Sequence, residues 1–211
     1  MRRRPADASG LVAGYADATG RFLPLVCTLN AARVLGTVAD LLGRSPAEFD
    51  ELALSAPPGA GGLTLLPYLD GERTPNLPDA RGLLAGLSRA NASAANLARA
   101  AVEGMLGGLA DALDALRAQG VPVERVLLIG GAARSRAVRA IAPALFGAPV
   151  SVPRPVEYVA LGAARQAAWA LSGGAEPPQW PVAAEEVTAV STPQVHERYA
   201  DVRQRALELM N

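Results

Sequence analysis

The segment 126–135, with the sequence VLLIGGAARS, holds the residues whose types and spacing are best suited to contact a ligand. Four apolar residues precede Gly130 and Gly131, and a helical pattern follows from residue 136 toward Phe146. This order predicts a buried strand, a tight turn and a helix start. Glycine lets the backbone approach a ligand closely, and a helix N-terminus offers free N–H groups and partial positive charge. The segment therefore predicts a nucleotide or phosphate contact, with an ordinary strand-to-helix turn as the alternative.

The composition excludes several other chemistries for this sequence. All 20 basic residues are arginine, so a Walker-type P-loop, a Schiff-base lysine and a lysine base are excluded. The single Cys27 and single His196 argue against a disulfide, a multi-cysteine zinc site and a histidine-based triad. The net charge of zero does not favour nucleic acid or an anionic membrane. With no apolar leader or spanning run, we expect a soluble cytoplasmic protein.

The elements that position this segment follow an α/β order. Segments 11–15 and 21–27 predict two strands, with hairpin turn chemistry at Asp17–Gly20 between them. A helix should follow through Leu42, capped by Thr28 or Asn30. A second helix should start at Pro46 after its cap, Ser45.

The middle of the sequence predicts a strand, a polar segment and one long helix. The strand covers 63–69, and in the irregular segment 70–78 we expect Glu72 and Arg73 to lie in a solvated turn. Ser93 should cap a helix of residues 94–119 with apolar residues at helical spacing. Its three glycines, at positions 104, 107 and 108, each cost about 1 kcal/mol and predict a close neighbour. Arg99 and Glu103 are spaced to pair on the helix surface.

The last third alternates strands and helices. Strand 123–129 should lead into helix 136–145, and strand 149–152 into helix 157–171, whose small residues suit tight packing. A linker of 173–181 and a final helix of 195–210 complete the sequence. Together these elements predict an α/β fold with a mixed sheet flanked by helices.

Three segments of the sequence resemble the FGGY carbohydrate kinases, and the xylulose kinases most of all. The first combines Gly82-x-Leu84-x-Gly86-Leu87, eight residues, and Asn96-Leu97-x-x-Ala100-Ala101-Val102-Glu103, which matches the second FGGY signature at each defined position. The second, 67–75 (PYLDGERTP), is similar to a loop bordering the cleft between the two lobes of such kinases. The third, 129–135 (IGGAARS), is similar to the adenosine motif of the family. The resemblance covers residues 10–172.

The resemblance implies an actin-like, ribonuclease-H-like lobe that is incomplete at its N-terminus. In such kinases two lobes enclose ATP and Mg²⁺ together with the sugar, and an aspartate acts as general base for phosphoryl transfer. By resemblance, the adenine and ribose side of the site should be formed by Gly130, Gly131, Ala132, Ala133 and Ser135. We expect the sugar and Mg²⁺ only together with an N-terminal lobe.

The sequence also departs from the family pattern. Segments equivalent to the N-terminal lobe, its catalytic aspartate and the Gly-Thr-Ser-Gly phosphate hairpin are not found, and neither Asp70 nor Asp79 matches the catalytic position. We therefore assign no catalytic and no metal-ligating residue. Ala132 replaces the third glycine of the adenosine motif, and Arg33 stands where many relatives have a glycine near the nucleotide.

These observations leave two main hypotheses and a third, weaker one, an unrelated α/β domain with a chance motif. The chain is half of a sugar kinase that needs a partner lobe, or it is an inactive fragment or interaction module that retains the fold. The expected organisation is a disordered start at 1–9, the kinase lobe at 10–173, and a linker and helix at 174–211. An unpaired sheet edge at Leu11–Tyr15 would favour self-association, including a homodimer.

Overall fold

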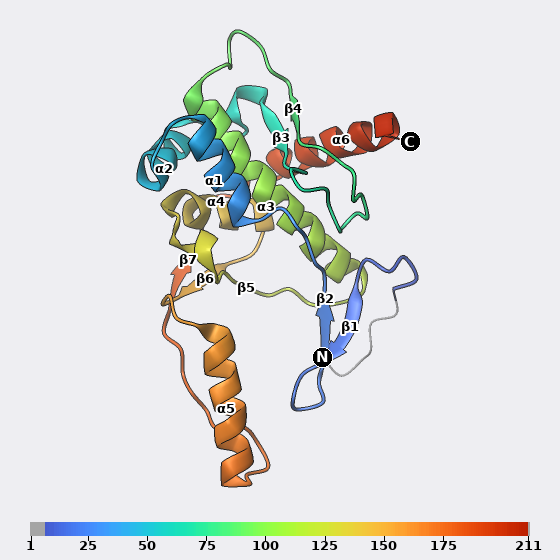
Figure 1. The fold of residues 1–211 in the computed structure, drawn as a ribbon, viewed down its shortest axis with the longest axis vertical. Helices are drawn as coiled ribbons and strands as arrows, with labels where there is room; N and C mark the ends of the chain where they lie inside the picture. The colour runs from blue at the N-terminus through green and yellow to red at the C-terminus, as the bar shows by residue number, and fades with distance from the viewer. Residues whose placement is uncertain (1–6, 211) are drawn as a thin grey trace.

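The computed structural model describes residues 7–210. The long helix α3 runs through the middle of the molecule, and α1, α2 and α4 pack against it (Figure 1). The elements follow in the order β1 (Ala13–Ala16), β2 (Phe22–Leu25), α1 (Ala32–Leu41), α2 (Pro46–Ser55), β3 (Thr64–Leu66), β4 (Leu83–Ala85), α3 (Ala94–Ala118), β5 (Val126–Leu127), α4 (Arg136–Phe146), β6 (Val150–Pro153), α5 (Tyr158–Ser172), β7 (Ala184–Val187) and α6 (Pro193–Met210).

The strands form three small sheets. β1 and β2 make an antiparallel hairpin, β3 and β4 make a second antiparallel pair, and β5, β6 and β7 make a mixed sheet. In the mixed sheet β5 runs parallel to β6, whereas β7 runs antiparallel to it. The predicted mixed α/β architecture is therefore confirmed. Strands β4 and β7 were not expected from the sequence.

Helix α3 forms the centre of the core, and its glycines mark close approaches. Ser93 caps it as predicted, with its side chain accepting from the backbone N–H of Asn96. A Cβ at Gly104 would lie 2.1 Å from the Leu65 carbonyl oxygen of β3, and one at Gly107 would meet the ring of Tyr199. The predicted close neighbours are thus β3 and α6. Any larger residue at these two positions would push apart α3 and the element beside it.

The expected surface pair on α3 is buried instead. Arg99 Nε lies 2.5 Å from Glu103 Oε1, and the two side chains are only 8% and 6% exposed. The prediction was wrong because helical spacing shows which residues meet, not which face is covered. Glu103 also accepts from the backbone N–H of Gly59 at 3.0 Å, so this pair ties the loop after α2 to the central helix.

The polar segment after β3 likewise has a buried anchor. Glu72 is 4% exposed and accepts from the backbone N–H of Leu29 at 2.7 Å and from the side chain of Asn30 at 2.9 Å. The solvated turn expected for Glu72 was therefore wrong. Asn30 is committed to this contact and to the Gly71 carbonyl. It does not cap α1, whose N-cap residue is Ala31 without a side-chain bond.

The hairpin at the start of the described chain has the expected local chemistry. Asp17 accepts from the backbone N–H groups of Thr19 and Arg21, which closes the turn between β1 and β2. Of the expected disordered segment 1–9, residues 1–6 lie outside the described residues. Asp7 accepts from the backbone N–H of Val12 at 2.7 Å. Within the described chain β1 pairs only with β2, so its other edge is unpaired.

Helix α5 extends away from the rest of the molecule (Figure 1). None of its residues is buried, and Val159 and Leu171 are 89% and 92% exposed. The tight packing expected for this helix was wrong: its small residues have no facing element in the described chain. The buried strand predicted at 123–129 is also shorter and less buried than expected: β5 has only two residues, and Leu127 and Ile129 are both more than half exposed.

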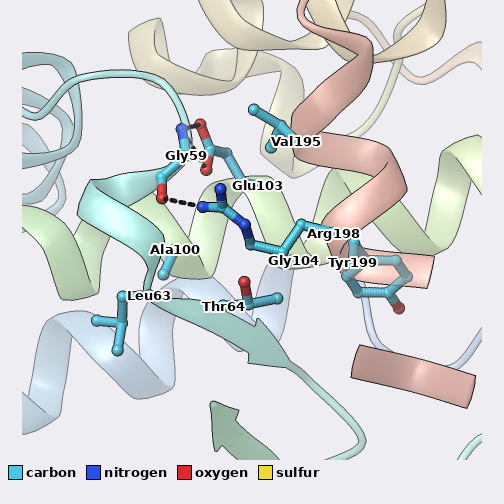
Figure 2. A pocket seen from close by; sticks show the side chains of 9 residues that line it. All are labelled: Gly59, Leu63, Thr64, Ala100, Glu103, Gly104, Val195, Arg198 and Tyr199. Carbon is cyan, nitrogen blue, oxygen red and sulfur yellow. Dashed lines mark hydrogen bonds between the residues drawn. The ribbon is translucent and has the colours of Figure 1, made fainter. Parts of the chain in front are cut away.

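Helix α6 packs against α3, with Val195, Arg198 and Tyr199 facing the junction (Figure 2), and charged side chains hold it there. His196 Nε2 lies 3.0 Å from Asp111 Oδ1, and Arg203 pairs with the same carboxylate. Arg198 donates to the Gly59 carbonyl at 3.4 Å. The hollow between these elements has a volume of about 10 Å³, at the lower limit for one water molecule. This junction is a packing contact rather than a ligand site.

Candidate functional site

The turn after β5 is built by glycine geometry and a capped helix. Gly130 has φ of +91°, a conformation that residues with a Cβ rarely adopt, and Gly131–Arg134 form one turn of 3-10 helix. Ser135 then caps α4, its hydroxyl accepting from the backbone N–H of Val138 at 3.1 Å. The predicted strand, turn and helix start are present in that order.

A cavity of about 560 Å³ lies beside this turn. Its walls come from the turn, from α1 and from α2, and they are mostly apolar. The lining residues are Ala32, Leu35, Gly36, Ala39, Pro46, Ala47, Phe49, Asp50, Gly131, Ala132, Arg134, Ser135 and Arg136. A volume of this size is typical of small-molecule sites, which are concave and apolar with a few polar groups.

Helix α2 supplies one wall because its start is fixed locally. Ser45 and Glu48 form a reciprocal capping box, with Pro46 in the first turn. The helix buries Phe49, which is 2% exposed, and Asp50, which is 7% exposed. The sequence predicted this helix but did not single out the face that borders the cavity.

Asp50 joins α2 to the start of α4. Its Oδ1 accepts from the Ser135 hydroxyl at 2.5 Å, and its Oδ2 accepts from the backbone N–H of Arg136 at 2.7 Å. The free N–H groups expected at this helix start are thus partly used within the protein. A carboxylate also faces the positive end of the helix. The predicted phosphate contact at the start of α4 is therefore not favoured.

A second cavity, of about 480 Å³, lies on the other side of the same turn. It opens where β5 and β6 end, and the carboxyl ends of parallel strands are the usual ligand-binding edge of α/β sheets. Pro153, Pro155 and Tyr158 contribute to its wall from the β6 side. Gly131 and Arg134 line both cavities, so the turn forms the partition between them.

The structure brings the five predicted site residues together around these cavities. Gly130 and Ala133 line the second cavity, Ala132 and Ser135 line the first, and Gly131 lines both. Ala133 is 5% exposed, and its carbonyl accepts from Arg139 Nε.

Arg33 lies elsewhere. Its guanidinium pairs with Asp70 at 2.7 Å on the surface, and it lines a separate hollow with Leu29 and Leu69. Arg33 therefore lines neither of the two cavities beside the turn, although the sequence placed it near the nucleotide.

Sequence reasoning missed Leu35, Gly36, Phe49 and Asp50 as cavity residues. They lie at least 80 positions before the turn, so no local spacing connects them to it. Within residues 7–210 no group of three or more His, Cys, Asp and Glu side chains is placed to hold a metal ion. The described helices also include none that is both long and apolar enough to span a membrane.

Comparison with known proteins identifies the class. The C-terminal domain of the FGGY family of carbohydrate kinases matches residues 6–171. The chain therefore belongs to this family. It is 50% identical over 173 residues to the xylulose kinases of Streptomyces coelicolor and Streptomyces rubiginosus, a match that covers 82% of this chain and 34% of each relative. The chain thus spans about a third of the length of these relatives.

A solved structure agrees with the sequence comparison. The fold is similar to that of xylulose kinase from Bifidobacterium adolescentis, with a TM-score of 0.87 and 47% sequence identity. The match covers 96% of this chain and 40% of that one. The chain therefore has the fold of a sugar-kinase C-terminal lobe, as the FGGY resemblance implied.

Proposed function

We propose that this chain is the adenosine-binding lobe of a sugar kinase that transfers the γ-phosphate of ATP to D-xylulose. The observation that carries the proposal is the apolar cavity against the Gly130–Ser135 turn, in a family of carbohydrate kinases. The flat, uncharged adenine base suits the apolar walls that α1 and α2 provide, and the glycines of the turn let the backbone lie close to the base. The lobe would comprise residues 10–173, followed by a linker and helix at 174–211.

The phosphates, Mg²⁺ and sugar would be held mainly outside this chain. The described residues present no carboxylate cluster for a metal ion, and Asp50 faces the start of α4. When bound, Mg²⁺ would neutralise charge on the transferred phosphate. The size and apolar walls of the cavity suit the adenosine end of ATP, and the described residues offer no ligand cluster for the metal.

Calorimetric titration with adenosine, ADP and ATP tests nucleotide binding. Gly131→Val is the informative variant, because Gly131 lines both cavities and a Cβ there meets no atom within 4 Å, so the added side chain has open space beside the turn. Gly162→Val, on α5, is the matched control, since its Cβ also meets nothing within 4 Å. We expect weak binding that Gly131→Val abolishes and the control preserves. Equal binding by all three proteins would show that the turn is not the site.

A second experiment separates the lobe from the alternative, a non-catalytic interaction module. We expect no xylulose-dependent ADP release from the 211-residue chain alone, because general-base help contributes about 10²- to 10⁴-fold and no base is assigned here. Addition of a family N-terminal lobe should restore turnover to a two-part kinase. Turnover by the chain alone would contradict the proposal that the catalytic base and the sugar site lie outside this chain. Nucleotide binding without restored turnover would favour the interaction module.

A further inference from the structure

The buried carboxylate of Asp50 does more than line the cavity. It contacts two groups more than 80 positions away in the sequence, the Ser135 hydroxyl at 2.5 Å and the Arg136 backbone N–H at 2.7 Å. Hydrogen bonds to an ionised group are stronger than neutral ones. Asp50 therefore anchors the last residue of the turn to α2 and fixes the distance between two walls of the cavity.

The same carboxylate changes what the start of α4 can bind. A helix N-terminus normally attracts anions through free N–H groups and partial positive charge. In α4 the Arg136 N–H donates to Asp50 and the Val138 N–H donates to Ser135. A phosphate placed there would meet two donors already in use and a negative charge beside them.

Two arginines, Arg134 and Arg136, also line the cavity, but both are exposed, and water and salt screen exposed charges more than buried ones. The Arg136 side chain is 62% exposed, and its guanidinium lies 3.4 Å from Glu51. The inner wall consists of apolar residues such as Leu35, Ala39 and Phe49, all of which are buried. The negative carboxylate is thus the buried charged group on the wall.

We propose that Asp50 is the specificity-determining residue of this cavity: it holds the turn in place and excludes anionic groups, so the cavity accepts a nucleoside ring and the phosphates lie outside. The part of this proposal that concerns adenosine rests on the proposed function, whereas the exclusion of anions does not depend on it. Asp50 acts on the ligand through the turn and through charge, so it is a positioning residue rather than a catalytic one.

Asp50→Asn and Asp50→Ser test the proposal, with Glu51→Gln as the matched control. Glu51 is the neighbouring acidic residue, 71% exposed, and contacts only the Arg136 side chain among the described hydrogen bonds. The probes are adenosine and inorganic pyrophosphate, titrated separately into each folded protein. Thermal unfolding identifies which Asp50 variant remains folded, and the serine variant provides a smaller uncharged side chain if asparagine strains the contact.

For an Asp50 variant we expect adenosine affinity to fall about tenfold and pyrophosphate affinity to rise about fivefold as donors and positive charge are released. Glu51→Gln should change both by less than about twofold. An Asp50 variant that binds both probes like the unmodified chain would overturn the proposal. If the unmodified chain fails to bind adenosine, the proposed function falls, and the pyrophosphate result alone decides whether Asp50 excludes anions.

Discussion

Helices α4 and α5 follow the two parallel strands of one sheet, and both are rich in alanine, yet they differ in nearly every structural respect. Eight of the eleven residues of α4 are buried, and its N-terminus is capped by Ser135. No residue of α5 is buried, and its N-cap residue Glu157 makes no side-chain capping bond. Helix α4 has α2 and α3 to pack against, whereas α5 has no such neighbour in the described chain.

This difference teaches that composition alone does not place a helix in the core. The apolar residues Val138, Ile141 and Leu145 of α4 recur at helical spacing and join the core cluster to which α2 and α3 also contribute. Helix α5 has small and apolar residues on several sides, which suits burial against more than one element. Its apolar side chains are left exposed because that covering is absent, so α5 is the part of the chain most suited to association.

The largest expected effect comes from removing matched apolar side chains from the two helices. Ile141→Ala should lower the free energy of unfolding by about 2–5 kcal/mol, because Ile141 is 2% exposed and leaves a cavity. Leu171→Ala, at a 92% exposed position, should change it by less than about 0.5 kcal/mol. Urea unfolding measures both. Similar losses would mean that α5 is packed in solution and would remove the contrast.

A smaller effect should follow from the helix caps. Ser135→Ala should cost about 1 kcal/mol, because the Val138 N–H and one Asp50 oxygen lose their shared partner. Glu157→Ala has no cap to remove and should cost less than about 0.5 kcal/mol. The same unfolding experiment gives both values, and a loss at Glu157 as large as that at Ser135 would contradict the comparison.

The exposed face of α5 should promote weak self-association of the chain. Val159 and Leu171 are almost fully exposed, and the edge of β1 is unpaired within the described chain. We expect light scattering after size exclusion to give a mass above that of the monomer that rises with concentration. Replacing both residues by glutamate should reduce it, as should co-expression with a family N-terminal lobe. A sharp monomer peak at all concentrations would refute this prediction.

The smallest expected effect on stability concerns α6. This helix extends the comparison of α4 and α5, because charged side chains rather than apolar ones hold it against α3. The hydrogen bond to Asp111 is the main cause that raises the pKa of His196 above 6.5. A raised folded-state pKa means that this contribution to stability is fully present below about pH 6.5 and is lost as pH rises through the folded value. His196→Gln should therefore reduce the loss of stability between about pH 6 and 8. An unchanged pH profile in this variant would rule out the contribution.

Local sequence signals predicted local structure well. Ser45 and Ser93 cap their helices as expected, because a cap bonds to a backbone N–H three residues away, and Ser135 caps α4 in the same way although it was not singled out as a cap. Asp17 closes its turn for the same reason. The family resemblance also identified the turn at Gly130, whose positive φ suits glycine. The five residues predicted to contact adenosine line the two cavities beside this turn, and their role in binding stays a prediction.

Only the tertiary structure decided which polar groups are buried and what they hold. Asp50 and Ser135 are separated by 85 positions, and Glu103 and Gly59 by 44, so no local pattern links them. Arg99 and Glu103 had the spacing to pair, but the chain packed over them decided that the pair is buried. Amino-acid type and spacing determined caps, turns and periodicity, because these depend on a few neighbouring residues. Burial depends on which segments, distant in the sequence, pack against a residue. This packing placed Asp50 in the cavity wall and left α5 exposed.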